Sequence, residues 1–596
     1  MKNSLAITAA LLCSAANVCG GNIAKKPNII FILTDDQGYG DLGCMGNPYI
    51  HTPNIDNLER ESFSFSDFHS GTTSAPTRAG IMTGKYCNST GVWHTINGRS
   101  LLSLDDQTLP QILNENGYET AMFGKWHLGD NYPYRPHDRG FKEALYHGGG
   151  GVGQTPDAWE NNYFDDTYFR NGVKEKTSGY CTDVWFEEAI SFIDKNKENP
   201  FFCYISTNAP HGPFNVEKKY ADLYAGNPNV PNPNFYGMIT NIDENVGKLM
   251  DYLSSRKLLD NTIVIYMTDN GTGGGAQFDE EGNLVKGFNA YMSGKKGSRY
   301  EGGHRVPFIM RVPGRVPRKI YSLSCHIDIL PTFLELCGLE EKIPSGIDGQ
   351  SLLSLMEKDE ESERYVFADN QRKEYLKKGR SNCVMYKKWR LLNGQNLYNV
   401  LSDPLQRVDL AERYPEMVKK MKEQYDLWWE RSSMKRAEKF EAIPVGDINE
   451  PYVLLYCHDL HNDKSGHPAW NQTLVRAAGD NSGYWALDVK KTGKYRVSLY
   501  RWTPDANLKL NEAAPAKEET WGNVVEYNEG VAIRDFESVE VLLNHELVQK
   551  KKVNDKKMCV EVTMNLKEGP CFLQADFIRK TGKRLSAYYV TVEPIK

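Results

Sequence analysis

Apolar strands alternate with amphipathic helices over the first half of the chain, from residue 27 to about residue 339. Between residues 235 and 253, apolar side chains recur at spacings of three and four, which predicts a helix with one apolar face. Strands that alternate with helices usually pair in parallel, with the helices on the faces of the sheet. The sequence therefore predicts an α/β domain with a mostly parallel central sheet over residues 26–345. The clearest strands are expected at 28–33, 201–206 and 262–267.

Residues 346–440 are predicted to form a smaller α+β subdomain. Short apolar strands are expected at 386–392 and 397–400, and an amphipathic helix is expected at 415–428. We expect this subdomain to pack against the α/β domain.

The pattern changes again after residue 444. Strands with alternating apolar residues are predicted at 484–489 and 495–502, and the polar stretch between them is typical of a hairpin turn. Further strands are expected at 539–543, 559–564 and 588–592. We therefore predict an accessory β-sandwich over residues 444–596.

Residues 1–20 are typical of a secretory signal peptide. Lys2 precedes an apolar run at 5–12, and small residues follow it. The sequence predicts an exported protein, periplasmic or extracellular.

No lipid anchor, membrane span or nucleic-acid partner is expected. Cys13 and Cys19 follow the large apolar residues Leu12 and Val18, where a lipoprotein signal normally has a small one. No later stretch approaches the ~18 apolar residues that a membrane span needs. A net charge of −6 gives no reason to expect a nucleic-acid partner.

The remaining cysteines do not have the spacing that is typical of zinc ligands. Disulfides are possible in an exported protein, but the spacing of the cysteines does not show which of them would pair.

Acidic and amide side chains follow two of the predicted strands. Asp35 and Asp36 come directly after the first strand, and Asp269 and Asn270 come directly after another. Ligands of open α/β sheets collect at the carboxyl ends of the strands, so both clusters can reach one crevice. An all-oxygen set suits Ca²⁺ or Mg²⁺ and not zinc. Either cluster alone would be typical of an ordinary turn.

Ser74 begins a segment that suggests anion chemistry. Pro76 suits the first turn of a helix, which places Ser74 at the positive end of the helix dipole. Arg78 follows four residues after Ser74 and therefore lies on the same side of the helix. The alternative is a capping serine beside a surface arginine.

Basic residues occur in three further loops. Lys125 and His127 follow a strand predicted near 120–123, and side chains two apart in an extended segment point the same way. His211 lies between two prolines that stiffen its loop, and Lys296 lies in a basic, glycine-rich loop. Alone, Lys125 and His127 would be typical of a surface pair, His211 would be typical of a structural residue, and the loop of Lys296 would be typical of a flexible surface segment. The interpretation of each loop therefore depends on the others.

Together, these segments resemble, in order and spacing, the formylglycine-dependent (type I) sulfatases of the alkaline phosphatase superfamily. The resemblance includes the Ser-x-Pro-x-Arg pattern followed by Thr-Gly and the run Gly-Lys-Trp-His-Leu-Gly, and it is highly specific in the basic, glycine-rich segment 294–307. The matching segments are 34–41, 74–84, 124–129, 208–213, 268–271 and 294–307.

The resemblance implies a modified residue and a metal. Ser74 would be oxidised to formylglycine (3-oxoalanine) by an anaerobic radical maturase, because the family commonly has cysteine there and serine versions use that enzyme. Ca²⁺, with Mg²⁺ as an alternative, would be held by the hydrated residue 74 and four side chains. These are Asp35, Asp36, Asp269 and Asn270.

The resemblance also implies a role for each basic residue. Arg78, Lys125 and Lys296 would hold the sulfate, with Lys295 left in solvent. His211 would protonate the departing sugar oxygen, a task that suits an imidazole. His127 would take a proton from the hydrated aldehyde.

The substrate is expected to be a sulfated glycan, cleaved at a terminal sugar such as a galactose or N-acetylgalactosamine sulfate. His147, Gln154 and His304 are the candidate sugar contacts. Two alternatives stay open. One is a phosphate-ester hydrolase of the same superfamily that uses unmodified Ser74, and the other is a non-catalytic glycan-binding protein.

Overall fold

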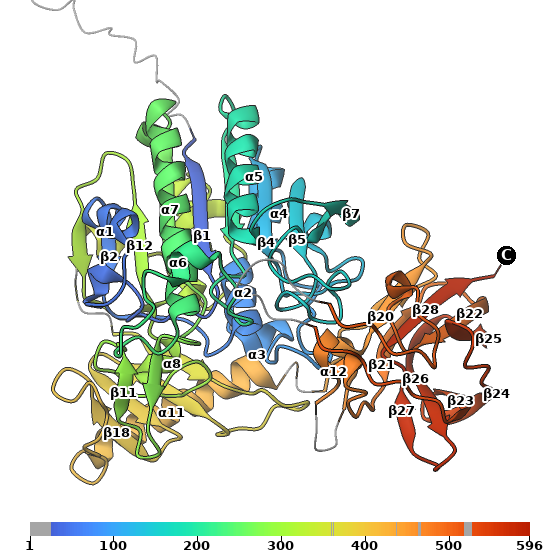
Figure 1. The fold of residues 1–596 in the computed structure, drawn as a ribbon. Helices are drawn as coiled ribbons and strands as arrows, with labels where there is room; N and C mark the ends of the chain where they lie inside the picture. Colours follow the sequence, from blue (N-terminus) through green and yellow to red (C-terminus); the bar gives the residue numbers. More distant parts are fainter. Residues whose placement is uncertain are drawn as a thin grey trace, which may run out of the picture.

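A mixed sheet forms the centre of the first domain (Figure 1). The computed structural model describes residues 26–358, 360, 363–434, 436, 438–462, 467–517 and 527–595, so the predicted signal peptide lies outside the described residues. Within them the sheet has ten strands in the order β13-β2-β12-β9-β1-β8-β4-β5-β6-β7. The five central strands, β9 to β5 in this order, are parallel, and strands on both sides of them run antiparallel. The prediction of a mostly parallel central sheet is confirmed, with a mixed periphery.

The bounds of these strands agree with the apolar patterns. In chain order they are β1 (Asn28–Thr34), β2 (Phe63–Phe65), β4 (Glu119–Lys125), β5 (Glu143–His147), β6 (Thr167–Arg170), β7 (Val173–Lys176), β8 (Phe201–Ser206), β9 (Thr262–Thr268), β12 (Phe308–Arg311) and β13 (Arg318–Ile320).

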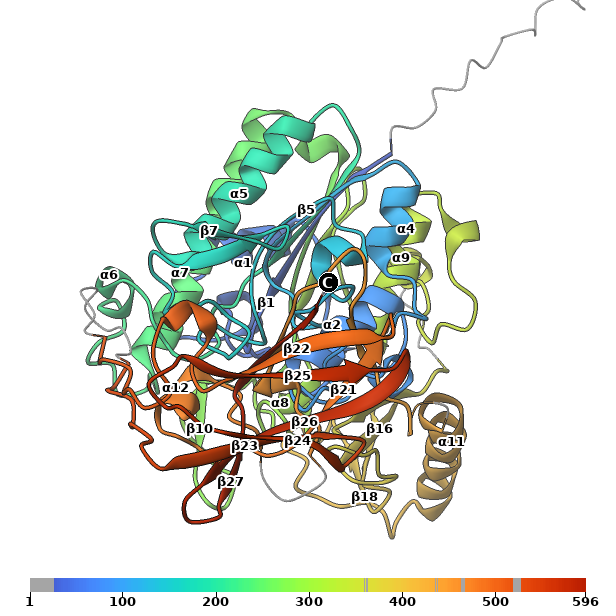
Figure 2. The ribbon, with the colours of Figure 1, turned by 90° about the vertical axis from the view of Figure 1, so that its right-hand side faces the viewer.

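Helices cover both faces of the sheet, as Figure 2 shows. Helices α5 (Cys181–Asn196) and α7 (Pro233–Ser255) lie on one face and share a core with Ile30 and Ile32 of β1. On the other face, helices α2 (Ser74–Thr83), α4 (Leu109–Glu115) and α9 (Ile329–Leu336) pack on a core that contains Phe31 and its alternate neighbours. Successive side chains of a strand point to opposite faces, so β1 is buried on both sides.

A smaller antiparallel sheet follows the first domain. It contains β15 (Val366–Asp369), β16 (Asn382–Tyr386), β17 (Trp389–Leu392) and β18 (Asn396–Asn399), and α11 (Pro415–Ser433) packs on β16. The single strand predicted at 386–392 is wrong. A tight turn interrupts it, because Lys387 adopts a left-handed conformation (φ 49°) and the chain reverses from β16 into β17.

The C-terminal region forms two sheets packed face to face around one apolar core, here called the β-domain. One sheet contains β19 (Ile443–Val445), β21 (Trp485–Val489), β26 (Gly569–Arg579), β23 (Phe536–Leu543) and β24 (Glu546–Lys552), with β27 (Arg584–Ser586) beside β26. The other contains β20 (Val453–Tyr456), β28 (Tyr589–Pro594), β22 (Gly493–Tyr500) and β25 (Cys559–Leu566).

The hairpin predicted between 484–489 and 495–502 is wrong. Strand β21 pairs with β19 and β26, whereas β22 pairs with β25 and β28 in the opposite sheet. Both strands bury apolar side chains in the same core, so their alternation looks alike although the chain crosses between sheets.

The β-domain and the first domain share buried contacts. Leu101 and Tyr134 of the first domain belong to the apolar core of the β-domain. The ring centroids of Trp159 and Trp502 lie 5.9 Å apart. Among the described residues every cysteine is free, and no helix combines the length and apolar character that a membrane crossing requires.

Candidate active site

The acidic residues predicted from the sequence meet at the carboxyl ends of β1 and β9. Asp35, Asp36 and Asp269 are buried, and each offers a carboxylate oxygen within 4.8 Å of the others. Asn270 is also buried, and its Nδ2 donates a hydrogen bond to Asp36 Oδ1 at 3.0 Å. The parallel pairing of the two strands brings together side chains that are more than 230 residues apart in the sequence.

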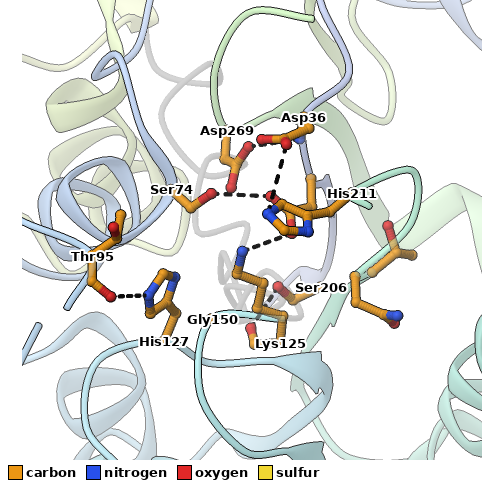
Figure 3. A network of polar contacts seen from close by, with 12 residues as sticks. Asp36, Ser74, Thr95, Lys125, His127, Gly150, Ser206, His211 and Asp269 are labelled. Carbon is orange, nitrogen blue, oxygen red and sulfur yellow. Dashed lines mark hydrogen bonds and ion pairs between the residues drawn. The ribbon is translucent and has the colours of Figure 1, made fainter. Parts of the chain in front are cut away.

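Ser74 is the first residue of α2 and faces this cluster (Figure 3). Its Oγ lies 3.0 Å from Asp35 Oδ1 and 3.4 Å from Asn270 Oδ1. Arg78 lies one turn later, and its Nη2 donates to Asp269 Oδ2 at 2.9 Å. All ten residues of α2 are buried, so the alternative of a capping serine beside a surface arginine is wrong.

Two lysines pair with the acidic cluster. Lys125, the last residue of β4, places its Nζ 2.6 Å from Asp35 Oδ2, and Lys296 Nζ lies 2.7 Å from Asp36 Oδ2. Lys295 is exposed, as expected. The positive charges of Arg78, Lys125 and Lys296 therefore surround one small space beside Ser74.

Burial and charge act against each other on these carboxylates. Burial raises the pKa of Asp35 to about 7, although Lys125 opposes it. For Asp36, burial is outweighed by Lys296 and His211, which hold its pKa well below its usual range. Three crowded carboxylates are expected to favour a bound cation, because it would offset both their burial and their mutual repulsion.

His211 approaches the cluster from the loop after β8. Its Nε2 lies 3.7 Å from Asp36 Oδ2, and its Nδ1 lies 2.6 Å from the Gly212 carbonyl oxygen. Burial lowers the pKa of His211 to about 4, and the positive charge of Lys296 adds to this effect. A bound sulfate would bring negative charge next to the ring and raise the pKa again.

His127 lies on the Thr95 side of Lys125 in Figure 3. Its Nε2 lies 2.9 Å from the Thr95 carbonyl oxygen, and its buried Nδ1 has no hydrogen-bond partner among the described residues. Burial, together with Lys125, holds the pKa of His127 well below its usual range, so the ring is neutral. The segment is not extended here as the sequence suggested, because His127 adopts φ 61°, in the left-handed region that non-glycine residues occupy less often.

The three candidate sugar contacts lie in different places. Gln154 lines a cavity together with His211. His147 is buried, with its Nδ1 3.0 Å from the Gly148 carbonyl oxygen. His304 is fully buried, and its two ring nitrogens face His69 Nδ1 and the Arg299 carbonyl oxygen. In this position His304 is not available to a sugar, because its polar atoms already have partners inside the protein.

Sequence reasoning missed several residues that shape the site. Ser206 accepts a hydrogen bond from Arg78 and donates one to the Lys125 carbonyl oxygen. Gly150 packs on His127, because a Cβ at Gly150 would lie 2.2 Å from His127 Cε1. The glycine-rich run around Gly150 was a visible signal of close packing, whereas no motif marks Ser206.

The residues present fit a divalent cation. The cluster offers carboxylate oxygens and an amide oxygen next to the Ser74 hydroxyl, which is the chemistry that Ca²⁺ and Mg²⁺ require. Asp35, Asp36, Asp269 and Asn270 would hold it. When bound, such a cation polarises a coordinated oxygen and lowers its pKa.

Comparison with known proteins places the chain in a family. A family model described as Sulfatase matches residues 27–339, more than half of the chain. The chain belongs to the sulfatase family. A second model, described as N-sulphoglucosamine sulphohydrolase, C-terminal, matches residues 294–428 of the sulfatase.

Named relatives of this sulfatase act on sulfated sugars. The N-acetylgalactosamine-6-sulfatase of Canis lupus familiaris is 30% identical over 387 residues, which cover 60% of this sulfatase and 71% of the relative. The N-acetylgalactosamine-6-O-sulfatase of Bacteroides thetaiotaomicron is 29% identical over 496 residues, which cover 68% and 93%. This sulfatase is therefore a sulfuric ester hydrolase and a carbohydrate sulfatase.

The fold agrees with this assignment. The crystal structure of Ps i-CgsB in complex with k-i-k-neocarrahexaose aligns with a TM-score of 0.61 and 31% identity, over 70% of this sulfatase and 95% of that chain. The sulfatase has the alkaline-phosphatase-like fold that its sequence predicts, with an additional C-terminal β-domain.

Calcium is expected to raise the melting temperature of this sulfatase by several degrees relative to protein in EDTA. A cation that binds only the folded state stabilises it by about 2.7 kcal/mol at a hundredfold excess over Kd. Asp35→Asn should reduce this shift, whereas Asp222→Asn, at an exposed carboxylate, should preserve it. The melting temperature is measured by thermal unfolding in Ca²⁺, Mg²⁺ or EDTA. Identical unfolding curves in all three would contradict the presence of a cation site.

Proposed function

We propose that this protein is an exported sulfatase that removes sulfate from a terminal sugar of a glycan through a formylglycine made from Ser74. The observation that carries this proposal is the position of the Ser74 hydroxyl, 3.0 Å from Asp35 in a buried site that also gathers Arg78, Lys125 and Lys296. A formylglycine, once hydrated, supplies the nucleophilic oxygen that attacks sulfur. The proposal includes Ca²⁺, with Mg²⁺ as an alternative, an anaerobic radical maturase as partner, and a periplasmic or extracellular location.

The basic side chains have separate tasks in this proposal. Arg78, Lys125 and Lys296 bind the sulfate oxygens and offset the charge that develops as the sulfur–oxygen bond breaks. Neutral His127 can accept a proton from residue 74. His211 donates a proton to the sugar oxygen that leaves. The bound anion matters because its negative charge raises the pKa of the ring, so that the ring can take up this proton from solvent beforehand.

A galactose or N-acetylgalactosamine sulfate is the proposed substrate. The relatives named above support it, since two of them are N-acetylgalactosamine 6-sulfatases. Gln154 supports it from the site, because it lines a cavity that His211 also lines. The acid and a candidate sugar contact therefore share one space.

Mass spectrometry of the peptide that contains Ser74 tests the chemistry. Protein from a host with the radical maturase is expected to lack two hydrogen atoms at residue 74, or to show the hydrate, and to release sulfate from sulfated sugars. Protein from a host without that enzyme should carry serine and be largely inactive. Protein that keeps serine in its native host, and hydrolyses phosphate esters instead, would refute the proposal in favour of a phosphatase.

A further inference from the structure

A cavity of about 310 Å³ lies between the first domain and the β-domain. His211 and Gln154 line it from the first domain, and Trp470, Asn471 and Tyr527 line it from the β-domain. Pockets for small ligands range from ~300 to 1,000 Å³, so this cavity is large enough for a ligand of modest size. The residues that line it from the β-domain lie outside the segments that the family models match.

The cavity adjoins the proposed acid. His211 lines it, and the same ring places Nε2 3.7 Å from Asp36 Oδ2 in the acidic cluster. Gly151 also lines the cavity and lies against this ring, because a Cβ at Gly151 would be 3.3 Å from His211 Cε1. A group bound in the cavity is therefore next to the imidazole ring of His211.

Hydrogen bonds hold the β-domain wall of the cavity in place. Thr155 N donates to the Trp470 carbonyl oxygen at 3.1 Å, and Gln472 N donates to the Gly153 carbonyl oxygen at 2.9 Å. Tyr527 Oη donates to the Asn161 carbonyl oxygen at 2.7 Å. The bond between Thr155 and Trp470 joins residues 315 apart in the sequence, and the bond between Tyr527 and Asn161 joins residues 366 apart. Together these bonds fix the position of Trp470 relative to the first domain.

The chemistry of the lining favours a neutral sugar ring. Among the described residues that line the cavity, none is Asp, Glu, Lys or Arg, so it is not built for the sulfate or for a second charged group. Trp470 is partly exposed and offers an aromatic surface, and amides and hydroxyls surround it. An aromatic surface with a few polar groups suits the apolar face and the hydroxyls of a sugar.

We propose that the β-domain completes the substrate site, with Trp470 binding the ring of the sugar whose leaving oxygen His211 protonates. This inference rests on the proposed function and deepens it, because it assigns sugar recognition to a domain outside the family segment. The charged residues beside Ser74 then recognise the sulfate, and the interdomain cavity recognises the uncharged part of the substrate.

Variants of Trp470 in the full matured protein test the inference. For Trp470→Ala, kcat/KM on N-acetylgalactosamine or galactose 6-sulfate is expected to fall roughly tenfold or more, mainly through KM, as for a truncated aromatic contact. Hydrolysis of 4-nitrophenyl sulfate, which needs only the sulfate site, should stay within about twofold of wild type. Trp470→Phe should retain most of the activity on the sugar.

Trp389→Ala is the matched control, because Trp389 is also a partly exposed tryptophan but lies in β17. It should leave the ratio of the two activities unchanged. Wild-type rates on the sugar for Trp470→Ala would overturn the inference, and so would an equal loss on both substrates.

A binding experiment separates the inference from the proposed function. Tryptophan fluorescence measures the binding of unsulfated N-acetylgalactosamine and galactose to the unmatured protein, which still carries Ser74. If the wild type hydrolyses no sulfated sugar, the proposed function fails, and the inference stands only if a sugar binds and Trp470→Ala removes that binding.

Discussion

Replacing Ser74 by alanine is expected to lower sulfate-ester hydrolysis by ~10⁴-fold or more, the scale seen when a catalytic nucleophile is removed. Alanine has no oxygen at Cβ, so neither a hydroxyl nor an aldehyde can form there. The fold should persist, because the single hydroxyl proton donates one hydrogen bond, to Asp35 at 3.0 Å or to Asn270 at 3.4 Å, worth about 1 kcal/mol. Sulfate release from a sulfated sugar by matured protein measures the effect.

Ser62→Ala is the control for this change. Ser62 is also buried and bonds to the Leu58 carbonyl oxygen, away from the acidic cluster. Its removal should leave activity near wild type. Substantial hydrolysis by Ser74→Ala, with the melting temperature unchanged, would show that another group attacks the ester.

Replacing His211 by alanine is expected to lower the rate on a sugar sulfate by ~10²- to 10⁴-fold, the usual contribution of a general acid. A sugar alkoxide is a poor leaving group and needs the proton. An acidic phenol does not, so the loss on 4-nitrophenyl sulfate should be much smaller. Initial rates on both substrates give the comparison.

The pH profile provides a second measurement of the same variant. In the absence of substrate, burial lowers the pKa of His211 to about 4, and the positive charge of Lys296 contributes to this shift. A bound sulfate is expected to raise the pKa. Only the protonated ring can donate, so the wild-type rate on the sugar should fall as pH rises through the pKa in the complex. The variant should lack this limb, and His51→Ala, at an exposed histidine, should keep it. An equal loss on both substrates would contradict the assignment of His211 as the acid.

The strands that hold the site were predictable from the sequence because they are buried on both faces. β1, β8 and β9 read as short apolar runs that end in polar residues, and their bounds agree with the prediction to within one residue. The convergence of Asp35 and Asp269 follows from parallel pairing. The link between Ser74 and these residues needed the resemblance to a family, since nothing in the local pattern of α2 says which strand end it faces.

Two errors and one omission have physical reasons. Alternation along a strand does not identify its partner, so β21 and β22 looked like a hairpin although they lie in opposite sheets. His304 looked like a site residue because it follows the Lys296 loop, but it turns inward to His69. Trp470 was missed because its approach to His211 depends on contacts between segments about 315 residues apart, for which a single sequence has no signal.

The apolar core that the β-domain shares with Leu101 and Tyr134 bears on where the polypeptide can be cut. Removing everything after residue 443 would expose both side chains to water and leave the carbonyl oxygen of Gly153 without the partner that Gln472 supplies. Limited proteolysis or a shortened gene would therefore disturb the glycine-rich loop beside His127 as well as remove a domain. We expect the smallest piece of this chain that folds cooperatively to extend beyond residues 27–339, which the sulfatase family model matches.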